Sequence, residues 1–259
     1  MMRYSLDGRV IPTINGGKGS GNWGHKGRPG KVGGSGKGSF VDSLAKESLA
    51  EAKKQEKATT SDMKSITKGA GGYMEGLEFK LKGEDSLKRK ILTDAKENSP
   101  ISKEKLEEAN KGIHDNLRYT TILKDSEFKS GFDKMKKDLE AKGYKFMKIK
   151  NTMADVSGGY RGINTQIKNP EGYIFELQFH TKESFDAKMV VHKDYEIARD
   201  PKRPLVKRRA AEKRMAKLYK SLKTPNGVEK IKSIDKFKNM LDFLTEVCYN
   251  CIVKEERSM

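Results

Sequence analysis

Apolar and polar positions alternate along four segments of the chain after residue 110, as they do in half-buried β-strands. Each segment is rich in β-branched and aromatic residues, which favour strands. The predicted strands cover 117–124, 144–151, 160–168 and 173–181. The sequence NPEG separates the last two, and its Pro and Gly predict the turn of a hairpin.

Helical spacing of apolar residues marks the segments around these strands. Between the first two strands, four residues that share one helical face predict an amphipathic helix that ends before Gly143: Phe128, Phe132, Met135 and Leu139. Asp85 and Ser86 begin a helix before the first strand. After the fourth strand we expect helices over 182–200, over the basic segment 204–223, and from Gly227 to about Val253. This order predicts an α/β (α+β) fold, with a mixed sheet of about four to five strands flanked by helices.

The residues before 73 lack this pattern. Residues 1–40 are rich in glycine and poor in apolar residues, which predicts a flexible tail. Residues 41–72 combine Ala, Glu and Lys with few large apolar residues, so we expect a solvated helical tether that contributes little core. The predicted organisation is completed by one α/β domain over 73–222 and a C-terminal helix over 223–259 that packs on it.

Charge narrows the class of partner. The chain has 54 Lys and Arg against 36 Asp and Glu, a net charge of +18, which favours nucleotides, RNA, DNA or acidic membrane surfaces as partners. A lysine-rich solvated surface explains the same number. No apolar run approaches the roughly 18 residues of a membrane span, and the first residues lack a signal-peptide core, so we expect a cytoplasmic protein.

The only two cysteines, Cys248 and Cys251, exclude a disulfide framework. They are expected to be ordinary residues of a terminal helix, although a redox pair or half of a zinc site is conceivable.

Polar residues on the third and fourth strands are predicted to share one face of the sheet. Glu176, Gln178 and His180 alternate with apolar residues on the fourth strand, because successive side chains point to opposite faces. Tyr160 and Asn164 lie across the hairpin from them. Periodicity alone favours an amphipathic strand with one side in water.

Acidic and basic groups elsewhere change that interpretation. A nucleotide site needs acidic side chains to hold Mg²⁺, basic side chains to hold phosphates and an aromatic ring on which the nucleobase can stack. Asp115 precedes the first strand and Glu176 lies on the fourth. The basic groups gather in one short stretch, which alone would be a solvated face: Lys80, Lys82, Lys88, Arg89 and Lys90.

The motifs GYRGINT and FELQFHT, followed by Lys188, His192 and Tyr195, resemble the synthetase domain of the RelA/SpoT superfamily over roughly residues 77–200. The resemblance is closest to small secreted or phage- and toxin-associated ATP:nucleotide 3′-pyrophosphokinases, and it implies their nucleotidyltransferase-like synthetase fold. It further implies that four residues grip the triphosphate of ATP: Lys80, Lys82, Arg89 and Lys90.

The resemblance also implies the remaining roles. Asp115 and Glu176 would coordinate Mg²⁺, and Glu176 would also act as the base. Gln178 would orient nearby groups and Tyr160 would stack on the acceptor base. Arg118 and His192 are further candidates for phosphate contacts.

Three positions depart from the family pattern. Asn164 stands where the family usually has His, and His180 where it usually has Arg, so we expect both to bear on phosphate contacts or acceptor choice. Val156 stands where the family has Lys, a role that Lys148 or Lys150 would have to take.

The expected activity is transfer of pyrophosphate from ATP to the 3′-hydroxyl of a purine nucleotide, giving (p)ppGpp- or (p)ppApp-type products and AMP, in a phage or toxin-type effector. One alternative is the same chemistry on the 3′ end of tRNA, with the basic run 201–220 as an RNA track. The other is a non-enzymatic phage structural or nucleic-acid-binding protein, because GSGNWGHKGRPGKVGGS (19–35) resembles a segment of phage head-associated proteins. The expected partners are therefore ATP, an acceptor nucleotide or tRNA, and a phage particle or a cognate antitoxin or immunity protein.

His114 and Asp115 also match the start of a metal-dependent HD phosphohydrolase. We reject that interpretation because such a domain needs further His and Asp ligands, and the chain has four histidines in all.

Overall fold

The computed structural model describes residues 3–4, 10–11, 35–96, 101–200 and 202–237. The chain divides into two units, Met1–Gly34 and Ser35–Met259. In the first unit, β1 (Arg3–Tyr4) pairs antiparallel with β2 (Val10–Ile11). The rest of the predicted tail up to residue 34, and both cysteines, lie outside the described residues.

A six-stranded mixed sheet forms the centre of the second unit, in the order β3-β4-β7-β6-β5-β8. The strands are β3 (Tyr73–Glu75), β4 (Arg118–Ile122), β5 (Lys145–Asn151), β6 (Ile163–Lys168), β7 (Ile174–His180) and β8 (Ile234–Asp235). The pair β4–β7 is parallel and the other neighbours are antiparallel. The predicted fold class is confirmed, and all four predicted strands are present. Sequence patterning missed β3 and β8, which are too short to show alternation.

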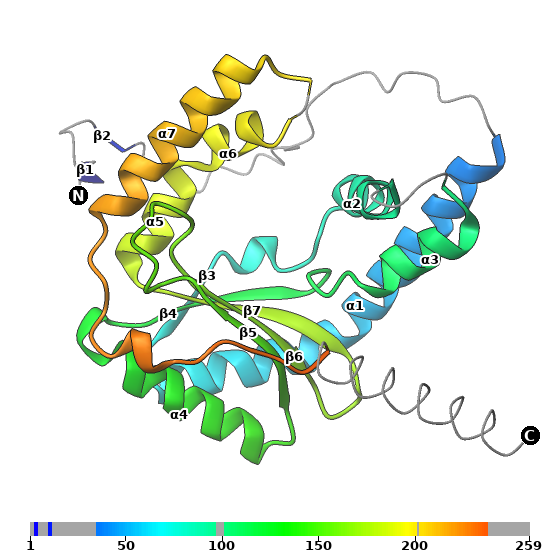
Figure 1. Cartoon of the computed structure of the whole chain (residues 1–259). Helices are drawn as coiled ribbons and strands as arrows, with labels where there is room; N and C mark the ends of the chain where they lie inside the picture. The colour runs from blue at the N-terminus through cyan, green and yellow to red at the C-terminus, as the bar shows by residue number, and fades with distance from the viewer. Residues whose placement is uncertain (1–2, 5–9, 12–34, 97–100, 201, 238–259) are drawn as a thin grey trace, which may run out of the picture. The chain divides into compact units, whose positions relative to one another are not determined.

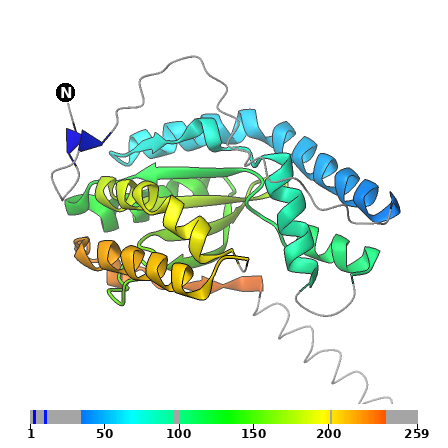
Figure 2. The same ribbon diagram turned by 90° about the horizontal axis from the view of Figure 1, so that it is seen from above.

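Helices pack on both faces of this sheet (Figures 1 and 2). The helices of this unit are α1 (Ser35–Gly69), α2 (Glu84–Lys96), α3 (Lys103–Lys111), α4 (Phe128–Ala141), α5 (Lys182–Val190), α6 (His192–Ala198) and α7 (Leu205–Ser221). The helices α1 and α4 cover one face, and α5 lies on the other. Among the described residues, no helix is long and apolar enough to cross a membrane.

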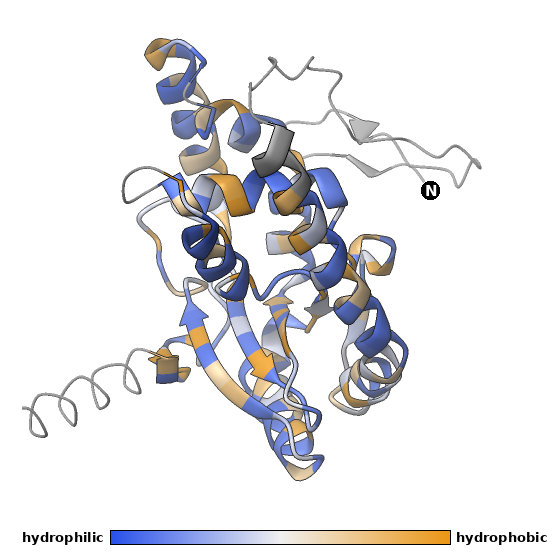
Figure 3. Cartoon of the chain, turned by 90° about the vertical axis from the view of Figure 1, so that its right-hand side faces the viewer, coloured by the Kyte–Doolittle hydropathy of each residue, from blue (hydrophilic) through white to orange (hydrophobic). Residues whose placement is uncertain are grey.

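The main core lies between the sheet and the pair α1 and α4. Phe175, Leu177 and Phe179 of β7 are fully buried there, and the Phe179 ring lies edge-on to that of Phe132 in α4, with centroids 4.8 Å apart. Alternation therefore places the polar residues of β7 on the opposite face, as predicted. Figure 3 shows hydrophilic and hydrophobic bands along the strands. The predicted apolar face of α4 is also buried in this core.

The helix α1 is part of this core, so the expectation that residues 41–72 contribute little to it is wrong. Ala52, Met63 and Ile66 are buried in the main cluster, and the hydroxyl groups of Thr60 and Tyr119 hydrogen-bond at 2.7 Å. The buried side chains of α1 include small or polar residues such as Ala52 and Thr60, which the hydrophobic pattern of the sequence does not mark as core positions.

Two helical predictions differ from the structure, and one helix was not predicted. The single helix predicted over 182–200 is broken at Val191 into α5 and α6. The helix predicted from Gly227 begins instead as a 3₁₀ turn and an edge strand, because Gly227 has a φ of 77° and Ile234 pairs with Ile149. The part of the helix predicted from Gly227 that follows residue 237 lies outside the described residues. The helix α3 was not predicted; Ser102 caps it by accepting a hydrogen bond from the Lys105 amide at 3.3 Å.

If α1 is a core element, Met63→Ala should lower the free energy of unfolding by about 2–5 kcal/mol, because the truncation leaves a cavity in the main cluster. Denaturant titration measures the change. Lys64→Ala, at an exposed neighbour on the same helix, serves as the control and should change stability by no more than about 0.5 kcal/mol. Equal stability of the two variants would contradict the packing of α1.

Candidate functional site

Strand register brings the polar residues of three strands together on the face opposite α1 and α4. Arg118 of β4 pairs with Glu176 of β7 in the parallel ladder. Gln178 of β7 pairs with Asn164 of β6 in the antiparallel ladder. The predicted shared face of the hairpin is therefore present, and the parallel pairing adds Arg118 to it.

Asp115 lies just before β4 and binds two ammonium groups. Lys82 Nζ is 2.5 Å from its Oδ2, and Lys90 Nζ of α2 is 3.1 Å from its Oδ1. The Lys82 amide donates to the Asn116 carbonyl at 2.9 Å, which fixes the lysine segment beside the strand. Burial alone would raise the pKa of Asp115, but the two lysines outweigh it and hold the pKa below its ordinary value.

The basic stretch divides between several partners. Lys80 Nζ lies 3.0 Å from the Glu56 carboxylate of α1, and Lys88 pairs with Asp42. Arg89 is exposed and donates to Ser86 Oγ at 3.4 Å. The structure thus joins Lys82 and Lys90 to Asp115, while Lys80 and Arg89 have partners away from it; their role toward ATP stays a prediction.

Glu176 is joined to Gln178 and Lys188 by a chain of hydrogen bonds. Lys188 Nζ of α5 donates to Gln178 Oε1 at 2.6 Å, and Gln178 Nε2 donates to Glu176 Oε2 at 3.0 Å. Burial raises the pKa of Glu176 against the effect of the Gln178 hydrogen bond, and the charge of Asp115 raises it further. Burial lowers the pKa of Lys188 to about 8, and Arg118 contributes to the same effect.

Tyr160 lies in a second network beside this chain. Its hydroxyl donates to Asn164 Oδ1 at 2.9 Å and lies 2.7 Å from His180 Nε2, while His180 Nδ1 lies 2.9 Å from Ser184 Oγ of α5. Gly162 makes room for this arrangement, because a Cβ there would lie 2.6 Å from the Tyr160 hydroxyl oxygen. Burial raises the pKa of Tyr160 well above its usual range.

His180 is fully buried, and this burial lowers its pKa to about 3. It is therefore neutral near pH 7, with one ring nitrogen toward Tyr160 and the other toward Ser184. The structure places Asn164 and His180, two of the three positions that depart from the RelA/SpoT pattern, around the same tyrosine hydroxyl.

Arg161, the residue after Tyr160, is fully buried. It donates to the Met153 carbonyl at 2.7 Å and to Thr224 Oγ1 at 2.7 Å. These bonds tie the loop that precedes β6 to the segment after α7. Sequence reasoning missed this anchoring role, because a single arginine in a glycine-containing loop gives no sign of burial.

The remaining candidates lie at the margins of the face. His192 is exposed at the start of α6, and Val156 is 64% exposed. Lys148 pairs with Asp235 of β8 at 2.5 Å, and Lys150 is exposed opposite Asn164 in the ladder. Whether any of these residues contacts phosphate stays a prediction.

Lys188 is the residue of this site that sequence reasoning undervalued. In the sequence it is only one residue of the motif that follows the fourth strand. A lysine on a helix usually has a solvated ammonium group, so its position alone predicts no role. Lys188 follows Ser184 by four residues on α5, so the two share one face of the helix. Ser184 lies against β7, and this spacing is the signal that marks Lys188.

Oxygen ligands suited to a divalent cation are present as a pair. Asp115 and Glu176 lie close enough for the charge of one to raise the pKa of the other. The described residues contain no group of three or more Asp, Glu, His or Cys that could hold a metal. Mg²⁺ commonly uses one or two carboxylates and completes its shell with water and phosphate oxygens, so the pair suits that ion in a complex with a phosphate.

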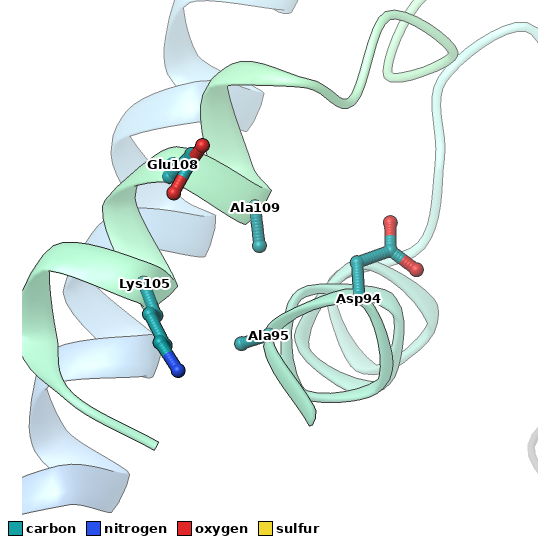
Figure 4. A pocket seen from close by; sticks show the side chains of 5 residues that line it. All are labelled: Asp94, Ala95, Lys105, Glu108 and Ala109. Carbon is teal, nitrogen blue, oxygen red and sulfur yellow. The ribbon is translucent and has the colours of Figure 1, made fainter. Parts of the chain in front are cut away.

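The hollow in Figure 4 lies away from this site. It has a volume of about 220 Å³ between α2 and α3, and it is lined by Asp94, Ala95, Lys105, Glu108 and Ala109. None of these is a predicted site residue. The candidate site is therefore defined by its charged groups and hydrogen bonds.

Comparison with known proteins found three solved structures of note. The complex of the Type VI effector Tas1 with its immunity protein is 18% identical, covers 67% of this chain and 93% of that one, and has a TM-score of 0.42. The smu.1046c protein from Streptococcus mutans UA159 is 13% identical, with coverage of 66% and 85% and a TM-score of 0.42. Small alarmone synthetase 1 from Bacillus subtilis, bound to its product pppGpp, is 16% identical, with coverage of 77% and 96% and a TM-score of 0.42.

These likenesses are too distant to assign an activity to this chain. No protein-family model matches the sequence, and no curated protein matches it.

The neutral His180 should make stability depend on pH. Because burial holds its pKa at about 3 in the folded state, against roughly 6.5 when unfolded, only the unfolded chain binds a proton between these values. The contribution of the neutral His180 to the free energy of unfolding is complete above pH 6.5 and falls as the pH decreases toward 3. In denaturant titrations between pH 6 and 4, His180→Gln should reduce the slope of stability against pH by up to about 1.4 kcal/mol per unit. An unchanged slope would contradict the burial of a neutral ring.

Lys188 should titrate well below an ordinary lysine. After reductive ¹³C-methylation of the lysines, one NMR resonance should show a midpoint of about 8, because the ammonium is largely withdrawn from water beside Arg118. The resonance is assigned by its loss in Lys188→Arg. A midpoint near the usual value of about 10.4 would show that Lys188 is solvated.

Proposed function

We propose that the chain transfers pyrophosphate from ATP to the 3′-hydroxyl of a purine nucleotide. The observation that carries this proposal is one set of side chains on the polar sheet face. It combines two carboxylates with four cationic groups: Asp115 and Glu176 with Lys82, Lys90, Arg118 and Lys188. The excess of positive charge suits a polyphosphate, and the two acids suit the cation that accompanies it.

The reaction assigns the roles of these groups. The acceptor 3′-hydroxyl oxygen forms a bond to the β-phosphorus of ATP, while the bond from that phosphorus to the oxygen bridging to the α-phosphorus breaks. AMP leaves with the bridging oxygen, and the hydroxyl proton passes to the Glu176 carboxylate. The raised pKa of Glu176 supports this role, because a general base works best when its pKa lies nearer the working pH.

The cationic residues hold the phosphates while this exchange takes place. Lys82 binds Oδ2 and Lys90 binds Oδ1 of Asp115, and Arg118 lies beside Glu176 in the ladder. Positioning and charge neutralisation carry most of the catalysis of phosphoryl transfer, so a rigid set of donors on a sheet suits the reaction. Tyr160 would offer a ring to the acceptor base from its place beside Asn164.

Asp115 and Glu176 would hold Mg²⁺ together with the phosphate oxygens. When bound, the ion would neutralise phosphate charge. Because each oxygen of Asp115 accepts a hydrogen bond from a lysine ammonium, metal binding there would compete with two positive charges.

A second candidate acceptor is the 3′ end of tRNA. The observation that favours it is α7, which presents exposed basic residues on several turns: Lys207, Arg209, Lys213 and Lys217. A basic helix of this kind can follow an RNA backbone. The chemistry at Glu176 would be the same.

The decisive assay supplies γ-labelled ATP and Mg²⁺ with GDP or GTP, with AMP or ADP, and with bulk tRNA in parallel. We expect release of AMP together with transfer of the label to one class of acceptor. Glu176→Gln should lower turnover by about 10²–10⁴-fold, because it removes the base and one metal ligand. Chelation of Mg²⁺ should abolish turnover.

Glu171→Gln is the matched control for this assay, because Glu171 is an exposed acid in the hairpin before β7. It should keep the turnover of the unaltered protein. If the unaltered protein and Glu176→Gln are equally inert toward every acceptor, the proposed function is wrong.

A further inference from the structure

The side-chain amide of Gln178 can face Glu176 in two ways, which differ by exchange of its oxygen and nitrogen. Only one of them gives Glu176 a hydrogen-bond donor. An ammonium group has donors and no acceptor, so a lysine beside Gln178 must face the amide oxygen. Lys188 does so, with its Nζ 2.6 Å from Gln178 Oε1, and the amide nitrogen is thereby directed to Glu176 Oε2 at 3.0 Å.

This position is costly for a lysine. Its ammonium is bonded to a neutral amide, with the guanidinium of Arg118 on β4 and the carboxylate of Glu176 on β7 as the nearest influences on its charge. The Phe185 ring of its own helix lies 5.7 Å away. An apolar residue on the same helix would avoid the loss of hydration, so stability alone does not account for a charge here.

The other lysine of α5, Lys182, shows the usual surroundings of a lysine on a helix surface. Lys182 pairs with Asp186 one turn along the same helix, at the helix surface. Lys188 has no such acidic partner among the hydrogen bonds and ion pairs of the described residues; its bond goes to an amide of the sheet.

From this geometry we propose that Lys188 is a positioning residue, which acts through Gln178 to hold the Glu176 carboxylate in its working orientation. The proposal rests on the proposed function, since it assigns a role within the same reaction. Glu176 gains a fixed hydrogen bond from a neutral donor, and Lys188 adds positive charge without occupying the carboxylate itself. Among the described residues no ammonium group binds the Glu176 oxygens directly, which leaves them to take a substrate proton or a cation.

Lys188→Met tests this role, because it keeps the length of the side chain and removes the ammonium. We expect kcat to fall by about 10–100-fold with little change in the KM for ATP, as is usual when a supporting contact of an active-site ligand is lost. Lys188→Arg keeps a donor and should recover kcat to within about tenfold of the unaltered protein. Lys182→Met, the matched control on α5, should keep the original kcat.

A double-mutant cycle separates positioning from a general effect on folding. If Lys188 acts through Gln178, the pair Lys188→Met and Gln178→Ala should lose no more kcat than the more impaired single variant. Losses that multiply would overturn the proposal. So would a Lys188→Met variant with unchanged kcat, or with a loss confined to KM.

Gln178→Glu keeps the test decisive if Lys188→Met does not fold. A glutamate at this position still accepts the Lys188 hydrogen bond, yet it has no amide hydrogen to donate to Glu176. We expect a folded protein whose kcat is reduced by at least tenfold; full activity of this variant would overturn the proposal. If the unaltered protein is itself inert with every acceptor, the proposed function fails and the role of Lys188 fails with it, whereas turnover that is insensitive to Lys188→Met overturns the positioning role alone.

Discussion

The parallel pairing of β4 with β7 is the constraint on which the candidate site depends. It places Arg118 opposite Glu176 and brings Asp115, just before β4, within electrostatic range of the same carboxylate. In the other ladder of β7, β6 contributes Asn164 beside Gln178. A shift of one residue in the β4–β7 register would turn the polar side chains of β4 into the core. The burial of the apolar face therefore also determines which charged side chains lie together on the other face.

The buried polar side chains of this face are stabilised in two different ways. Around Tyr160, the side chains are neutral and satisfied by one another, and His180 is neutral because burial disfavours its charged form and the charge of Lys188 adds to this effect. Around Asp115 and Glu176 the side chains are acidic and basic: two lysines hold the pKa of Asp115 low, whereas burial raises the pKa of Glu176. The first region gives rigidity, and the second keeps groups that can exchange partners with a charged ligand. Their border runs between Gln178 and His180, two residues apart on the same strand.

The sequence predicted the features that depend on the local periodicity of apolar residues. Alternation along β7 identified both its buried face and the polar residues Glu176 and Gln178, and helical spacing identified α4. It failed where the deciding contact is distant in the chain. Lys80 and Lys82 look equivalent in sequence, yet Glu56 of α1 binds one and Asp115 binds the other. Lys188 looks like a solvated helix residue until the helix is placed against β7.

Both oxygens of Asp115 are already in use, by Lys82 on one side and Lys90 on the other. A cation that arrives alone has to compete with two ammonium groups, and an anion that arrives alone has to draw those lysines from their carboxylate. When the two arrive as one complex, each displaced group finds a new partner of opposite sign. Under the proposed function, this arrangement would favour a metal–phosphate complex over either component alone.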